Sequence, residues 1–149
     1  MATLKIGTDW WTSPTTSESG KLIMVTGRSD MNAVISTGKF NDRVEITWKY
    51  EGDDTGMPDF DTSTLMEKVQ LAIEDVFDKD PIAVMTGIYT GDGERNWVLY
   101  TRSLTIFERK FNEALASFDL LPIALYVEKD PQWNEYREMR EQSEIMRGE

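Results

Sequence analysis

The 149-residue chain contains no cysteine and no histidine. Without cysteine it has no disulfides, no thiolate nucleophile and no cysteine-based zinc site. Without histidine it lacks the commonest general base and transition-metal ligand. Any catalysis would rest on carboxylate, lysine, tyrosine, serine or threonine side chains, and any metal would be a hard cation bound by oxygen. We therefore expect a non-catalytic protein, with no cofactor, no metal site and no catalytic residue.

Long apolar runs are also missing. No segment approaches the ~20 apolar residues that a membrane-spanning helix requires, and the first residues lack the apolar segment of a signal peptide. There is no phosphate-binding loop, dinucleotide-binding fingerprint or nucleophile elbow. These absences predict a cytoplasmic protein without a membrane partner.

Basic residues are few. The chain has 16 Lys and Arg residues against 27 Asp and Glu residues, which gives a net charge of −11. Such a chain is repelled by phosphate backbones and by anionic lipids, so we predict no nucleic-acid partner. The simplest interpretation of the charge is solubility, and the alternative is an acidic face that docks on a basic protein partner.

The length and the 40% hydrophobic content predict one domain over residues 1–149. Residues 1–42 are expected to form an N-terminal strand pair and a linker. The two strands are Leu4–Trp11 and Leu22–Gly27, and the residues between them have the Ser, Thr, Pro and Gly content of a loop. Residues 28–42 give no clear pattern beyond a short helix that begins at Ser29 or Asp30.

Residues 43–128 follow the order strand, helix, strand, strand, helix, strand. The evidence is an alternating strand, a helix with a capping-box signature, a hairpin with a Gly-Asp-Gly turn, a second amphipathic helix and an apolar strand expected to be buried on both faces. These elements are Arg43–Tyr50, the helix capped by Thr64 and Glu67, Ile82–Thr90, Glu94–Arg102, Thr105–Phe118 and Leu120–Val127. The order is the split β-α-β arrangement. We predict an α+β, ferredoxin-like β-α-β-β-α-β sandwich with its helices on one sheet face, two extra N-terminal strands and a C-terminal helix in residues 129–149.

Three segments resemble a bacterial family catalogued as domain of unknown function 695. They are "VEITWKYEGDDTGMPDF", the hairpin "TGIYTGDGERNWVLYT" and "YVEKDPQWNEY". The family has no established activity. Some of its members resemble fusions to a domain similar to a protein inhibitor of ribonuclease E, which shares a ferredoxin-like plan, and this implies regulation through protein contact.

The second strand of the hairpin offers two pairs of a cation and an aromatic ring. Arg95 and Trp97 lie on one face of the strand, and Tyr100 and Arg102 lie on the other. Such a pair could bind a carboxylate, a phosphate or a peptide. The alternative is that the rings pack in the core and the arginines are solvated or paired with acids.

The segment after Pro131 offers a second candidate site. Asp130 is expected to cap the last helix, and Trp133 and Tyr136, three residues apart, share one helix face. These rings either anchor a polar helix to the core or recognise a ligand. The candidate ligand- or partner-binding residues are therefore Arg95, Trp97, Tyr100, Arg102, Asp130, Trp133 and Tyr136.

Two functions from different classes remain open. The leading hypothesis is a non-catalytic regulatory protein that binds a partner through its sheet edge or its acidic surface, and an unpaired edge strand would also allow a homodimer. The alternative is a small Mg²⁺- or Ca²⁺-dependent enzyme that acts on a phosphorylated or anionic small molecule, with Arg95 or Arg102 as a charge clamp. The acidic loop over residues 51–61 could supply oxygen ligands, but its spacing does not match an EF-hand and favours a solvated loop.

Overall fold

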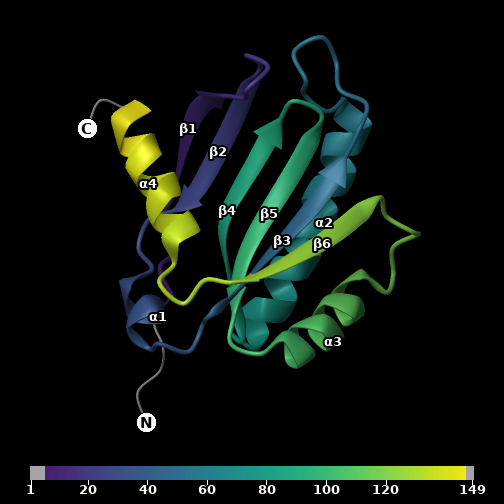
Figure 1. The fold of residues 1–149 in the computed structure, drawn as a ribbon. Helices are drawn as coiled ribbons and strands as arrows, with labels where there is room; N and C mark the ends of the chain where they lie inside the picture. The colour runs from purple at the N-terminus through teal and green to yellow at the C-terminus, as the bar shows by residue number, and fades with distance from the viewer. Residues whose placement is uncertain (1–5, 147–149) are drawn as a thin grey trace.

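The computed structural model describes residues 6–146, which form a six-stranded antiparallel sheet and four helices (Figure 1). The strands are β1 (Trp10–Thr16), β2 (Leu22–Arg28), β3 (Asp42–Lys49), β4 (Ala83–Gly91), β5 (Glu94–Thr101) and β6 (Ile123–Lys129). The helices are α1 (Asn32–Ser36), α2 (Phe60–Lys79), α3 (Leu104–Leu115) and α4 (Asn134–Met146). The predicted α+β class is confirmed.

The strands lie in the order β1-β2-β4-β5-β3-β6. Helix α2 connects β3 to β4 across β5, and α3 connects β5 to β6 across β3, so each crossover skips one strand. This order agrees with the predicted split β-α-β arrangement. The two N-terminal strands extend the sheet beyond β4.

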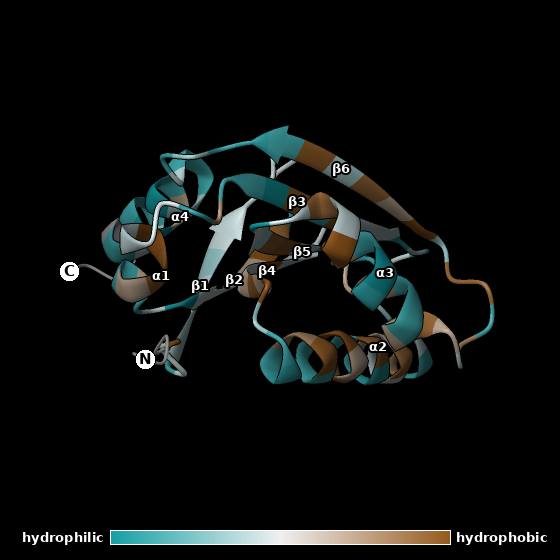
Figure 2. Ribbon diagram, turned by 90° about the horizontal axis from the view of Figure 1, so that it is seen from below, coloured by the Kyte–Doolittle hydropathy of each residue, from teal (hydrophilic) through white to brown (hydrophobic). Residues whose placement is uncertain are grey.

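One face of the sheet is covered by α2 and α3 (Figure 2). Strand β3 contributes Val44, Ile46 and Trp48 to this core, and Phe77 of α2 stacks on Phe107 of α3 with ring centroids 5.1 Å apart. The buried residues of α2 are Met66, Val69, Ile73 and Phe77. Their spacing of three and four residues places them on one helix face.

Helix α4 packs on the opposite face of the sheet, which corrects the prediction that all helices lie on one face. Strands β2, β4 and β5 carry apolar side chains on this face too, namely Val25, Val84, Val98 and Tyr100. Because these side chains also have to be shielded from water, the C-terminal segment folds over them. The sheet thus has two hydrophobic cores.

The predicted N-terminal strand is displaced. Strand β1 spans Trp10–Thr16 instead of Leu4–Trp11, and the first two residues of the predicted strand lie outside the described residues. The segment that contains Pro14 was predicted to be a loop. Because β1 is an edge strand, a proline without an N–H group is tolerated in it. Strand β2 is confirmed, and residues 28–42 contain the short helix α1.

The apolar sequence of β6 predicted a strand that is buried on both faces. This prediction is wrong. Among the described strands β6 pairs with β3 alone, and it forms an edge of the sheet. Leu125, Tyr126 and Val127 are 45%, 56% and 45% exposed. An apolar run indicates which side chains favour burial, but it does not reveal whether a neighbouring strand exists to bury them.

Two helix starts also differ from the prediction. Helix α2 begins four residues before Thr64, because the carboxylate of Asp59 accepts a hydrogen bond from the backbone N–H of Thr62 at 2.7 Å. Helix α4 begins at Asn134, after a turn that contains Pro131. Within residues 6–146 no helix is both long and apolar enough to cross a membrane.

Candidate functional site

Three aromatic rings attach α4 to the sheet. The ring of Trp133 stacks on Tyr100 of β5 with centroids 4.0 Å apart and meets Tyr136 edge-on at 5.5 Å. Trp133 Nε1 donates to the carbonyl of Phe40 at 2.8 Å, and the Tyr136 hydroxyl donates to the carbonyl of Arg28 at 2.6 Å. All three rings are buried, and their polar atoms have partners within the protein. These are the contacts expected of rings that anchor a polar helix to the core.

Asp130 joins this anchor to the start of α4. Its carboxylate accepts from the Tyr100 hydroxyl at 2.6 Å and from the backbone N–H groups of Asn134 and Glu135 at 2.9 and 3.1 Å. Burial raises the pKa of Asp130, but these three hydrogen bonds outweigh burial and hold the pKa below its usual value. Asp130 therefore caps the first turn of the helix, as the sequence predicted.

The other three predicted residues lie elsewhere. Trp97 is fully buried on the α2 face, where its Nε1 donates to Gln70 at 2.9 Å. Arg95 lies on the same face, donates to Thr90 Oγ1 at 2.8 Å, and lines a separate hollow of about 580 Å³. Arg102 follows β5 and is exposed. The structure thus separates these three residues from the other four candidates, which lie together: Tyr100, Asp130, Trp133 and Tyr136. A binding role for all seven residues stays a prediction.

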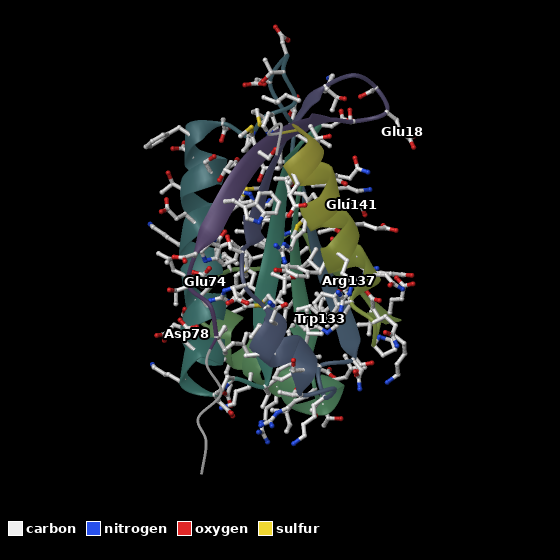
Figure 3. The ribbon with its side chains drawn as sticks, turned by 90° about the vertical axis from the view of Figure 1, so that its left-hand side faces the viewer. Glu18, Glu74, Asp78, Trp133, Arg137 and Glu141 are labelled. Carbon is white, nitrogen blue, oxygen red and sulfur yellow. The ribbon has the colours of Figure 1, made fainter. Side chains whose placement is uncertain are left out.

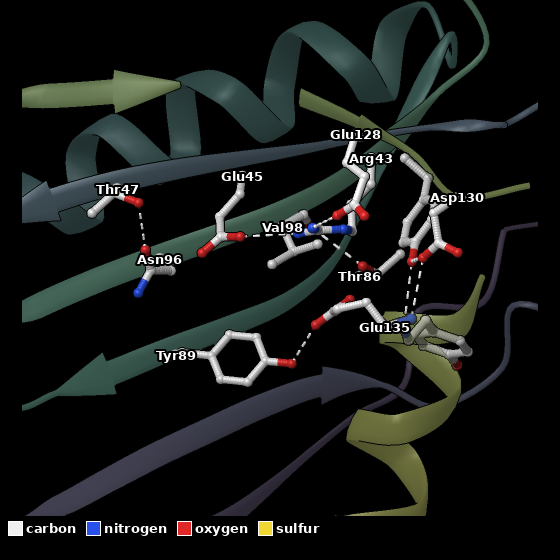
Figure 4. A network of polar contacts seen from close by, with 12 residues as sticks. Arg43, Glu45, Thr47, Thr86, Tyr89, Asn96, Val98, Glu128, Asp130 and Glu135 are labelled. Carbon is white, nitrogen blue, oxygen red and sulfur yellow. Dashed lines mark hydrogen bonds and ion pairs between the residues drawn. The ribbon is translucent and has the colours of Figure 1, made fainter. Parts of the chain in front are cut away.

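A cavity of about 260 Å³ lies between α4 and the sheet, beyond the aromatic anchor. Its lining comes from three strands and the helix: Ser13, Pro14, Thr15, Val25, Tyr89, Glu135, Glu138, Met139, Gln142 and Ser143. The Tyr89 hydroxyl donates to Glu135 Oε1 at 2.5 Å (Figure 4). The second carboxyl oxygen, Glu135 Oε2, and the hydroxyl of Ser13 are both buried without a hydrogen-bond partner in the described part of the chain.

Such unpartnered atoms are uncommon, because leaving a buried polar group unpaired costs about 1–3 kcal/mol. Sequence reasoning missed this cavity, since it assigned Ser13 to a loop and treated the last helix, which contains Glu135, only as a polar helix. The two residues are far apart in the chain, and only the packing of α4 on β1 and β2 brings them to one place.

The Glu135 carboxyl has an altered acidity. Burial raises its pKa above the ordinary value, although the hydrogen bond from Tyr89 and the nearby Arg43 guanidinium act in the opposite direction. Burial also raises the pKa of Tyr89, and the adjacent Glu135 adds to this effect. A group with a perturbed pKa inside a largely apolar cavity is typical of a binding or active site.

Replacing Glu135 by glutamine is expected to change how stability depends on pH. A carboxyl whose pKa is raised in the folded state favours folding at low pH, and this contribution is lost as the pH rises from about 4.3 through the folded value. Each unit by which the pKa is raised corresponds to about 1.4 kcal/mol. Urea unfolding between pH 4 and 8 should show the parent losing stability relative to E135Q, and parallel profiles would contradict the assignment.

Arg43 ties β3 to the edge strand β6 on the same face (Figure 4). Its guanidinium binds Glu45 at 2.9 Å and Glu128 of β6 at 2.5 Å, and it lies over the ring of Tyr126 at 5.7 Å from the centroid. The Arg43 side chain is 9% exposed, whereas that of Glu128 is 50% exposed. The edge therefore presents a half-exposed carboxylate next to an exposed ring.

The two edges of the sheet differ. Strand β1 contains Pro14 and is in contact with α4, so it is protected against pairing. Strand β6 contains no proline, and no helix of the described part of the chain covers its outer side; Figure 2 shows hydrophobic segments along it. Leu120, in the connection before β6, is also fully exposed. Within residues 6–146 no group of three or more acidic side chains is arranged to hold a metal ion.

The chain was compared with protein families, curated proteins and solved structures. A family model described as "Family of unknown function (DUF695)" matches residues 9–139. This match confirms the resemblance seen in the three sequence segments and extends it through β1 and β2. No curated protein and no solved structure matches the chain.

Proposed function

Because the chain belongs to the DUF695 family, whose function is unknown, we propose its role from its own geometry. The protein acts without catalysis by binding another protein, and an extended segment of that partner adds to the sheet along the free edge of β6. The observation that supports this proposal is a seven-residue edge strand with three large, exposed hydrophobic side chains in a row.

The backbone of β6 provides the affinity. Strand β6 pairs only with β3 among the described strands, so the N–H and C=O groups on its outer side have no strand partner there. An extended peptide that pairs with such an edge forms a ladder of main-chain hydrogen bonds, which is a recurring mode of peptide recognition. Large exposed apolar side chains on the same strand mark an interaction site.

The two faces of β6 set the chemistry of the partner. Leu125 and Val127 lie opposite Ile46 and Val44, so they point to the α2 and α3 face, where the partner must supply apolar side chains at alternate positions. On the other face stand Tyr126 and the half-exposed Glu128. The Glu128 carboxylate already binds Arg43 but is half-exposed, so a lysine or arginine there would be a second cation beside this carboxylate and the ring of Tyr126.

The occupant is therefore an extended segment with alternating apolar and basic residues. A second copy of this chain fits less well, because each copy carries a net charge of −11 and the two would repel each other. The cytoplasmic location and the absence of nucleic-acid and membrane partners remain part of the proposal.

Selection of a random ten-residue peptide library on the immobilised protein tests this proposal. The expected peptides carry the alternating pattern, and their affinity, measured by calorimetry, should fall at least tenfold in the variant Leu125→Lys, which corresponds to about 1.4 kcal/mol. Leu71→Lys is the matched control, since Leu71 is a similarly exposed leucine on α2 and the charge change is identical. In an extended peptide only every second backbone N–H group points toward β6. Methylating these nitrogens should abolish binding, whereas methylating the nitrogens of the intervening residues should preserve it.

Three results would overturn the proposal. One is a selection that yields no peptide, and another is equal binding to the parent and to Leu125→Lys. The third is a concentration-dependent dimer, seen by light scattering and removed by Leu125→Lys, which would place a second copy on this edge instead of a partner segment.

A further inference from the structure

We propose that the cavity between α4 and the sheet is a binding site for a small organic cation, an amine with an apolar body. This site is separate from the β6 edge, which lies at the far side of the sheet from β1 and β2. Its volume of about 260 Å³ falls just below the range of drug-sized ligand pockets, so the occupant is a small molecule.

The polar atoms in the cavity point to a ligand that donates hydrogen bonds. Ser13 is only 2% exposed, and its hydroxyl has no partner within the described residues. Glu135 Oε2 is buried in the same way, while Oε1 is occupied by Tyr89. Ser13 and Glu135 both line one cavity, and each has a buried oxygen without a protein partner, so the pair is suited to an ammonium group, which offers donors and no acceptor.

The charge of the lining selects a cation. Glu135 and Glu138 stand three residues apart on α4 and line the cavity, and none of its lining residues is a lysine or arginine. The nearby guanidinium of Arg43 is already bound to Glu45 and Glu128. A ligand ammonium would therefore be the counter-ion that Glu135 lacks inside the cavity.

The apolar part of the lining accommodates the body of the ligand. Val25, Pro14 and Met139 supply hydrophobic surface, and the ring of Tyr89 stands at the wall beside Glu135. Aromatic faces and thioether groups both favour contact with a cation or with its attached methylene groups. A neutral or anionic ligand of the same shape would leave the carboxyl group without a charge partner.

Binding should be linked to proton release. The charged and titratable groups that act on Glu135 are Tyr89 on β4, Arg43 and Glu45 on β3, and Asp130 before α4. Burial is the largest influence and favours the protonated carboxyl, whereas an ammonium in contact with Oε2 favours the ionised form. Amine affinity should thus rise with pH as Glu135 ionises.

The experiment compares three probes of similar shape on the full chain: cyclohexylamine, cyclohexanol and cyclohexanecarboxylate. Titrations followed by amide chemical shifts should show the amine perturbing Ser13, Tyr89 and Met139, with the alcohol and the carboxylate at least tenfold weaker. The variant Glu135→Gln keeps the shape of the side chain and should weaken the amine at least tenfold. The matched control Glu141→Gln removes the same charge from the exposed side of α4 (Figure 3) and should bind as the parent does.

Several outcomes would overturn the assignment. Equal binding of the alcohol and the amine would show an apolar cavity without a preference for charge, and an unchanged affinity in Glu135→Gln would exclude the carboxyl as the counter-ion. Chemical shifts that do not change at up to about 50 mM amine would also contradict the proposal, because this concentration is well above a Kd of 1 mM, which corresponds to −4.1 kcal/mol. Water would then be the partner of the two unpartnered atoms. Leu125→Lys on β6 should not change amine binding, so this test and the peptide test can fail independently.

Discussion

Replacing Trp133 by alanine is expected to lower the free energy of unfolding by about 3–5 kcal/mol. The indole is 1% exposed, stacks on Tyr100 and meets Tyr136, so its removal leaves a cavity at the only point where three rings hold α4 to β5 among the described contacts. The deletion also leaves the carbonyl of Phe40 without the indole N–H. Guanidinium denaturation at pH 7 measures the effect, as a fall in the midpoint.

Two further variants separate packing from general damage. Trp133→Phe retains an aromatic ring and should cost less than Trp133→Ala. Phe60→Ala, at a position that is 83% exposed, should change stability by no more than about 0.5 kcal/mol. A loss below about 1 kcal/mol in Trp133→Ala would show that the rings do not anchor the helix.

Replacing Asp130 by alanine is expected to cost about 2–4 kcal/mol at pH 7. The lost helix cap contributes about 1 kcal/mol, and the buried Tyr100 hydroxyl, left without its acceptor, contributes about 1–3 kcal/mol. Urea unfolding measures this difference. Asp54→Ala, at an exposed position in the loop before α2, is the control and should change stability by less than about 0.5 kcal/mol.

The effect of Asp130 should depend on pH. The pKa of this carboxyl is lower in the folded protein than in the unfolded chain, so its contribution is fully present above the unfolded value of about 3.9. The contribution is lost as the pH falls through the folded value. The difference between the parent and Asp130→Ala should therefore be constant from pH 5 to 7 and shrink below pH 4; an equal difference at pH 3 would contradict the proposed role of the ionised carboxylate.

Local patterns in the sequence were sufficient for most of the elements. The alternation of apolar and polar residues over Arg43–Tyr50 predicted β3, because period two is a property of the strand itself. The Gly-Asp-Gly turn predicted the hairpin, and both Gly91 and Gly93 have positive φ angles, as does Asp92. Asp130 was identified as a cap from its position alone.

Properties that depend on distant residues could not be obtained in this way. Whether β6 lies at an edge depends on the order of strands in the sheet, and its apolar side chains give no information on that order. The face on which α4 packs depends on side chains of β2, β4 and β5 that carry no local sign of what covers them. The cavity was missed for the same reason, since its two unpartnered atoms belong to β1 and α4.

The position of α4 also has a consequence for the nascent polypeptide. Val25 and Val84 belong to strands that are synthesised before the C-terminal segment. The residues that cover them in the folded protein, Trp133 and Tyr136, are synthesised after both. At a translation rate of about 5–20 residues per second, about 5–20 s pass between the synthesis of Val25 and the synthesis of Trp133 and Tyr136. Over that interval the growing chain exposes hydrophobic side chains of its strands. Holding chaperones would have their main opportunity to bind this surface before the C-terminal segment is synthesised.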